Sequence, residues 1–226
     1  MAIYSSDTSL TEVDHSKELP CLNVLSIDFD WVMAPSISLY NSNVAEGHDF
    51  WNEISDTITH CHLPLDYEKY LQLVQLTTWL KPTDIGVAES YREIITMLSR
   101  WLQKGQKFCI YNIDHHHDCG YAASDNSTYD DLTTYWSCAN WVAYLARKLP
   151  KQFQQYVFIG NPNSKTQLEP DVESIIPKYT YTSDISQLKN VEFDKVFLCH
   201  SSAWVPPIYS PLFESLKITF ENLIKK

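Results

Sequence analysis

The sequence lacks the features that mark secreted, membrane-spanning and zinc-ribbon proteins. Its six cysteines include no Cys-x-x-Cys pair, so a structural zinc ribbon is not expected and the thiols are expected to be free. No apolar run reaches the length of a membrane span, and the first residues are polar instead of forming a charged and then apolar signal. We therefore expect a cytoplasmic protein.

Basic residues are also scarce. The chain has 17 Lys and Arg residues against 28 Asp and Glu residues, which gives a formal net charge of -11 at pH 7. Nucleic-acid binding needs clustered Lys and Arg, so we expect no nucleic-acid partner, and we expect no membrane partner either. An acidic surface instead favours cationic partners, including a substrate with a guanidinium or ammonium group.

The length of 226 residues and the hydrophobic content of 44% fit one folded domain. We expect residues 1–20 to form a flexible leader and residues 21–226 to form a single α/β domain. Near-continuous apolar runs predict buried strands of a parallel sheet, and apolar residues at helical spacing predict helices. The predicted strands are 22–28, 85–88, 107–113, 156–160 and 195–200, and the predicted helices are 50–57, 67–79, 90–102, 132–149 and 210–224.

This alternation predicts a three-layer αβα fold with a mostly parallel sheet. In such folds ligands bind beyond the carboxyl ends of the strands. Polar clusters of this chain fall at several predicted strand ends, at 28–30, 89–91, 114–118, 161–163 and 200–202. A functional site is therefore expected at that edge of the sheet.

The densest of these clusters begins with Asp114, ends with Asp118 and contains three histidines. Alternate residues of an extended chain point to the same side, so Asp114, His116 and Asp118 are expected to face one way. Carboxylate and imidazole ligands together suit Mn²⁺, Fe²⁺ or Zn²⁺. A solvated polar loop is the alternative interpretation of this cluster.

A second acidic pair, Asp28 and Asp30, ends the first predicted strand. Two carboxylates on the same side repel each other unless one is protonated or a cation lies between them. The two clusters together supply four carboxylates and one imidazole, which can hold two divalent ions. Taken alone, the pair can also be an ordinary strand-to-loop junction in which Asp caps a turn.

Two motifs of the chain resemble the metal motifs of the arginase and ureohydrolase superfamily, which shares its fold with histone deacetylases: Ser26-x-Asp28-x-Asp30 with Pro35 downstream, and Asp114-x-His116-x-Asp118. The order of the motifs, followed by Asn140-Trp141 in a later helix, is most similar to the branch that includes peptide arginases. Those enzymes convert arginine in a peptide to ornithine. The resemblance implies an arginase-like fold and a hydrolase that releases urea.

The resemblance also implies a ligand set, made up of Asp28, Asp30, Asp114, His116 and Asp118, for one or two Mn²⁺ ions. In the family pattern the counterparts of Asp28 and Asp114 bridge the ions. Asp118 then belongs to one ion, and Asp30 and His116 belong to the other. The implied substrate is an arginine-containing peptide or another small cation, and a homo-oligomer is compatible with the pattern.

One position departs from the family pattern. Tyr91 stands where the family has a histidine, which leaves one ion site short of an imidazole. Three outcomes stay open: weakened occupancy, substitution by another side chain such as His200 or Glu89, or action with a single ion as in deacetylases. His117 is expected to pack, to support a ligand by a hydrogen bond, or to lie near substrate.

The sequence identifies no general base and no guanidinium-binding carboxylate. Candidates in loops on the same rim are His48, Glu46, Asp125 and Asp130. Two other functions remain open for this fold: a single-metal, deacetylase-like amidohydrolase, and a degenerate, non-catalytic binding protein. Cysteine catalysis by Cys119 or Cys199 lacks a complete set of nucleophile, base and orienting group.

Overall fold

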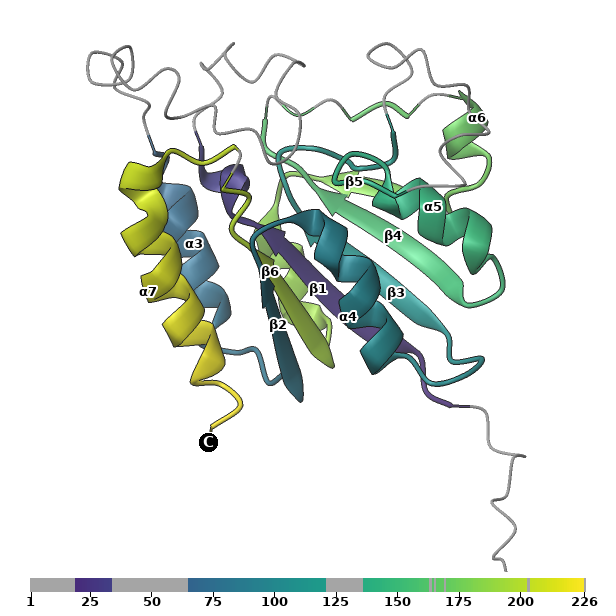
Figure 1. Cartoon of the computed structure of the whole chain (residues 1–226), viewed down its shortest axis with the longest axis horizontal. Helices are drawn as coiled ribbons and strands as arrows, with labels where there is room; N and C mark the ends of the chain where they lie inside the picture. Colours follow the sequence, from purple (N-terminus) through teal and green to yellow (C-terminus); the bar gives the residue numbers. More distant parts are fainter. Residues whose placement is uncertain are drawn as a thin grey trace, which may run out of the picture.

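The computed structural model describes residues 19–33, 65–120, 136–162, 164, 166–168, 170–202 and 204–225. Six strands form one sheet in the order β2-β6-β1-β3-β4-β5, and every neighbouring pair is parallel. The strands are β1 (Leu22–Asp28), β2 (Asp84–Ala88), β3 (Phe108–Ile113), β4 (Phe153–Ile159), β5 (Thr180–Thr182) and β6 (Lys195–Cys199). The predicted α/β class with a parallel sheet is confirmed (Figure 1).

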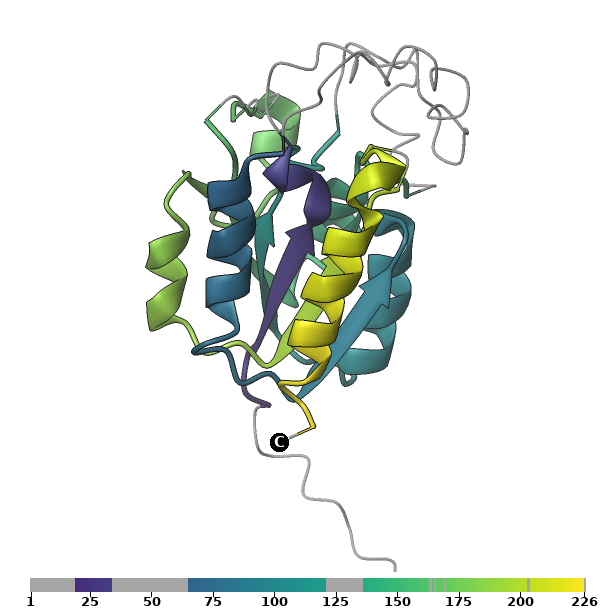
Figure 2. The same cartoon turned by 90° about the vertical axis from the view of Figure 1, so that its left-hand side faces the viewer.

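Helices cover both faces of the sheet (Figure 2). Helices α3 (Tyr67–Leu76) and α7 (Ser210–Glu221) pack on one face, and α4 (Ile94–Trp101) and α5 (Trp141–Lys148) pack on the other. Along β1, Leu25 and Ile27 face the first core and Val24 faces the second, so the strand is apolar on both sides. Among the described residues, no helix is long and apolar enough to cross a bilayer.

Two helices begin later than their apolar spacing predicts. The segment predicted at 90–102 opens with the 3-10 turn Tyr91–Glu93, because the Ser90 side chain accepts a hydrogen bond from the Arg92 N–H. The helix predicted at 132–149 begins at Trp141, and the Asn140 side chain accepts a hydrogen bond from the Ser137 N–H at 2.7 Å. Such local side-chain bonds compete with helix formation. Residues 132–135, the helix predicted at 50–57 and residues 1–18 of the predicted leader lie outside the described residues.

Several short elements, among them β5, α6 and η5, have no counterpart in the prediction. Strand β5 is polar and partly exposed at the edge of the sheet, so it lacks the apolar run that identifies the other strands. The helix α6 (Pro170–Glu173) and the 3-10 helix η5 (Ile185–Asn190) are too short for a helical repeat to be recognised.

The carboxyl ends of the central strands lie at one level. Asp28 at the end of β1 pairs in register with Cys199 of β6, and Ala88 of β2 pairs with the same residue. On the other side of β1 within the sheet, Ile113 of β3 pairs with Ile159 of β4. The residues that follow these strands therefore leave the sheet along one edge, where the sequence predicts the site.

Candidate metal centre

The first acidic motif leaves the sheet at the end of β1. Asp28 is the last residue of the strand, and Phe29–Val32 form a 3-10 turn, so the extended alternation predicted for Asp30 stops at Asp28. The turn is held by a hydrogen bond of 3.0 Å from the Asp30 N–H to Asp28 Oδ1. Both carboxylates are buried, with exposed fractions of 4% and 2%.

The second motif also turns away from an extended path. Strand β3 ends at Ile113, and the His116 N–H donates to Asp114 Oδ1 at 2.8 Å. Asp118 has a φ of 51°, in the left-handed region that Asp and Asn adopt more readily than other non-glycine residues. Asp114 and Asp118 are buried, whereas the His116 side chain is 31% exposed. His116 therefore lies on the solvent side of the motif.

Three of the five predicted ligands converge most closely. One ligand atom from each of Asp30, Asp114 and His116 lies within 4.8 Å of the other two. His116 Nδ1 is 3.3 Å from Asp30 Oδ2 and 3.9 Å from Asp114 Oδ1. Asp30 Oδ2 is buried and accepts no hydrogen bond from the described residues. Its nearest polar neighbour is the His116 imidazole, and two carboxylates with an imidazole suit Mn²⁺, Fe²⁺ or Zn²⁺.

The other two predicted ligands accept hydrogen bonds from protein groups. The Ser201 hydroxyl donates to Asp28 Oδ2 at 2.7 Å, and the Trp141 indole N–H donates to Asp118 Oδ2 at 2.6 Å. Ser201, like Asp118, has a left-handed backbone, with a φ of 50°. Strained backbone at residues other than glycine is concentrated at functional sites. Asp28 is thus oriented by the segment that follows β6, and Asp118 by the first residue of α5.

Burial and like charge disfavour ionisation of most of the cluster. Burial, together with repulsion from neighbouring carboxylates, raises the pKa of Asp28 and of Asp114 well above the usual value. Burial also raises the pKa of Asp118 to about 7. For Asp30, burial acts in the same direction, but the nearby imidazole of His116 outweighs it and keeps the pKa below the usual value. The cluster therefore binds protons that a divalent cation would displace.

Asn112 is a residue of the site that the sequence analysis missed. It is fully buried on β3, and its Nδ2 donates to Asp114 Oδ2 at 3.1 Å. Its Oδ1 accepts a hydrogen bond from the Tyr91 hydroxyl at 3.0 Å. Tyr91 is 1% exposed and stacks on Trp141 with ring centroids 5.5 Å apart. A polar amide inside an apolar strand is the signal in the sequence that could have identified Asn112.

His200 and Glu89, the predicted substitute ligands, pair with each other. His200 Nδ1 lies 2.8 Å from Glu89 Oε2, and His200 Nε2 lies 3.3 Å from Ser210 Oγ. The imidazole also stacks on Phe213, with centroids 4.3 Å apart. Both ring nitrogens therefore have polar neighbours other than the acidic motifs, and neither residue is part of the closest ligand group.

His115 and His117, the other histidines of the second motif, contact groups outside the closest ligand group. His117 is buried, and its Nδ1 accepts a hydrogen bond from the Cys119 N–H at 3.1 Å. His115 Nδ1 lies 2.8 Å from Asn161 Nδ2, beyond the end of β4. The predicted general-base and guanidinium-binding candidates, His48, Glu46, Asp125 and Asp130, lie outside the described residues.

A lysine borders the acidic cluster. The side chain of Lys69, in the first turn of α3, is 11% exposed, and its Nζ lies 3.8 Å from Asp66 Oδ2 and 5.3 Å from the centre of the Trp31 ring. Burial lowers the pKa of Lys69, while the charges of Asp66 and Asp30 act in the opposite direction. The sequence gives no sign of this lysine, since helices with exposed faces commonly carry lysine.

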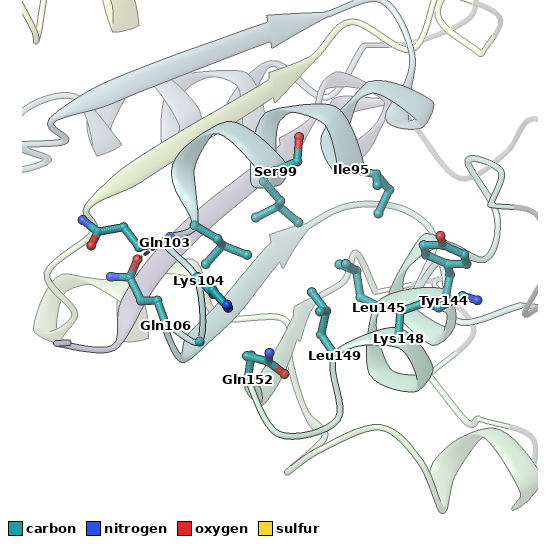
Figure 3. A pocket seen from close by; sticks show the side chains of 13 residues that line it. Ile95, Ser99, Gln103, Lys104, Gln106, Tyr144, Leu145, Lys148, Leu149 and Gln152 are labelled. Atoms are coloured by element: carbon teal, nitrogen blue, oxygen red, sulfur yellow. Dashed lines mark hydrogen bonds between the residues drawn. The ribbon is translucent and has the colours of Figure 1, made fainter. Parts of the chain in front are cut away.

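A groove lies elsewhere on the molecule, between α4 and α5 (Figure 3). Its walls are apolar side chains such as Ile95, Leu145 and Leu149, and Lys104 and Lys148 also line it. None of the predicted metal ligands lines this groove. The acidic cluster at the carboxyl edge of the sheet is therefore a separate site.

Comparisons with protein-family models, with curated proteins and with solved structures found no match for this chain. The chemistry of the acidic cluster is therefore the basis on which a function is proposed.

Proposed function

We propose that the protein is a metal-dependent hydrolase of a C–N bond, and that its substrate is the guanidinium group of arginine in a peptide, which it converts to ornithine and urea. The observation that carries the proposal is the convergence of the buried carboxylates of Asp30 and Asp114 with His116, whose Nδ1 lies 3.3 Å from Asp30 Oδ2. We further propose that the αβα arrangement is of the arginase type, since both acidic motifs follow neighbouring parallel strands.

In this proposal Asp30, Asp114 and His116 hold one Mn²⁺ ion, with Fe²⁺ or Zn²⁺ as substitutes, and Asp28 and Asp118 border a second position. A bound divalent ion would act as a Lewis acid and lower the pKa of water. The protein groups orient these carboxylates, because Ser201 and Trp141 fix Asp28 and Asp118 by hydrogen bonds.

The cationic substrate is supported by the electrostatics of the chain. The net charge of -11 favours attraction of a cationic group such as a guanidinium. Trp204 is half-buried, and its ring centroid lies 5.9 Å from that of His116, on the more exposed side of the cluster. An aromatic face in this position can stack against a guanidinium plane.

A second candidate function is a single-ion amidohydrolase of the deacetylase type. It is favoured by the closest ligand group among the described residues, which contains three residues and defines one position. Acetylated lysine in a peptide is the corresponding substrate, and acetate is the product to be measured.

Metal analysis followed by activity assays tests both functions. EDTA-treated protein would be loaded with Mn²⁺, its bound metal counted, and the product of an arginine-containing peptide analysed for urea and ornithine, with Asp114→Asn as the inactive control. Full occupancy without urea or ornithine would end the arginase proposal, and acetate released from an acetyl-lysine peptide would then support the amidohydrolase. Absence of bound metal, together with no thermal shift on adding Mn²⁺, would instead indicate a non-catalytic binding protein.

A further inference from the structure

A chain of buried hydrogen bonds lies directly beneath Asp114. The Ser26 hydroxyl donates to the Tyr91 hydroxyl oxygen at 3.0 Å, and the Tyr91 hydroxyl donates to Asn112 Oδ1, also at 3.0 Å. Asn112 Nδ2 then donates to Asp114 Oδ2 at 3.1 Å and to the Tyr156 hydroxyl oxygen at 3.2 Å. These four supporting residues are all buried. These hydrogen bonds connect residues of three different strands with the turn before α4.

Each hydrogen bond of this series has a donor and an acceptor that follow the order Ser26, Tyr91, Asn112 and Asp114. Tyr91 has a single hydroxyl proton, and because its oxygen accepts from Ser26, that proton is directed to Asn112 Oδ1. The amide oxygen of Asn112 is thereby held toward Tyr91, and its NH₂ group is held toward Asp114. The opposite amide orientation would place an oxygen against the Asp114 carboxylate, and the Tyr91 proton would then have to point to Ser26 Oγ instead.

We infer that Tyr91 is a positioning residue of the metal centre, which fixes the Asn112 amide so that Asn112 orients Asp114 for the metal. This inference rests on the proposed metal site. Tyr91 does not touch the metal position in this scheme, since its hydroxyl is occupied by Ser26 and Asn112 and its ring is stacked on Trp141. Groups that orient a ligand in this manner commonly alter metal affinity by about 10- to 100-fold when they are removed.

Tyr156 offers a matched comparison on the other side of the same amide. Its hydroxyl accepts from Asn112 Nδ2 and donates to the His117 carbonyl at 2.8 Å. Like Tyr91, it is fully buried. Removal of its hydroxyl leaves Tyr91 donating to Asn112 Oδ1, so the amide keeps its orientation toward Asp114. Tyr91→Phe and Tyr156→Phe thus each remove one buried hydroxyl, but only the first releases the amide.

The experiment measures Mn²⁺ affinity by calorimetry and metal-free stability by thermal unfolding. Tyr91→Phe should weaken Mn²⁺ binding by about 10-fold or more, and Tyr156→Phe should weaken it by less than about 3-fold, although both lower the unfolding temperature. In an Asn112→Ala background, Tyr91→Phe should cause no further loss of affinity, because it acts through the missing amide.

Equal affinities of wild type and Tyr91→Phe would overturn the inference, as would the same additional loss in the Asn112→Ala background. Failure of wild type itself to bind Mn²⁺ would instead refute the proposed function, so the two failures are distinguishable. If the variants do not fold, the inference is tested by ¹⁵N NMR of the wild-type protein. Addition of Zn²⁺ should shift the Asn112 side-chain amide more than that of Asn23, which donates to the Glu192 carbonyl. Equal shifts would overturn the inference.

Discussion

Replacement of Asp118 by asparagine should separate metal binding from the stability of the metal-free protein. Asp118 Oδ2 accepts the Trp141 indole proton, and the carboxyl group also hydrogen-bonds to Asp114. An asparagine can accept from Trp141 and donate to Asp114, and it adopts the left-handed φ of 51° as readily as Asp does. The substitution therefore removes a buried charge while the local contacts are kept.

The size of the effect follows from linkage between protonation and folding. Burial raises the pKa of Asp118 from its usual 3.8 to about 7. Because the folded pKa lies above the unfolded one, the stability contributed by this group is fully present below the unfolded pKa. It is then lost as the pH rises to about 7. A pKa difference of about three corresponds to roughly 4 kcal/mol. Metal-free Asp118→Asn should therefore be more stable than wild type at pH 8 by up to that amount, with little difference at pH 4.

Urea unfolding of EDTA-treated protein at the two pH values measures this difference in stability. Excess Mn²⁺ at pH 8 should then stabilise wild type more than Asp118→Asn, because the variant lacks a carboxylate that borders the second ion position. Asp84→Asn is a matched control, since Asp84 Oδ2 also accepts an indole proton, from Trp101 at 2.9 Å, at the amino end of β2. A metal-free Asp118→Asn protein that is less stable than wild type at pH 8, or that responds fully to Mn²⁺, would refute the reasoning.

Three further substitutions test the site and the core. Ser201→Ala removes the hydrogen bond of 2.7 Å to Asp28 and should weaken Mn²⁺ binding about 10-fold by calorimetry, whereas an unchanged affinity would show that Asp28 is not oriented by Ser201. His200→Gln should keep the Mn²⁺ stoichiometry by elemental analysis, because both ring nitrogens of His200 face Glu89 and Ser210; loss of metal would contradict this placement. Leu216→Ala, on the buried face of α7, should lower the free energy of unfolding by about 2–5 kcal/mol in urea titration without changing Mn²⁺ affinity.

The parts of the fold that follow from hydrophobic pattern could be predicted from sequence. The run ending in Asp28 is apolar on both faces because β1 lies in the middle of the sheet, and such runs identify central strands. Edge strand β5 could not be found, because Thr180–Thr182 are polar and partly exposed. The start of α5 was placed too early, since apolar spacing does not report the side-chain bond from Asn140 that opens a turn.

Both acidic motifs could be recognised in the sequence, and Asp30, Asp114 and His116 of these motifs converge, but the backbone of the motifs was not predicted. Alternation on an extended chain placed Asp28 with Asp30 and Asp114 with His116, whereas in each pair a hydrogen bond from the later N–H to the first Asp forms a turn. From the sequence, Tyr91 could be identified only as the residue that replaces a histidine of the family pattern. Its partner Asn112 lies 21 positions away in sequence, so the hydrogen bond between them depends on the three-dimensional fold.

The position of β6 has a consequence for how the chain folds. It is the last of the described strands in sequence, yet it inserts between β2 and β1. On a ribosome, β1 is made early and keeps one open edge until β6 emerges, and an open strand edge is a template for pairing with other chains. Ser201, which holds Asp28, arrives with that same late segment. Refolding should therefore be slow and sensitive to protein concentration, because β1 and β6 are far apart in sequence and must still pair.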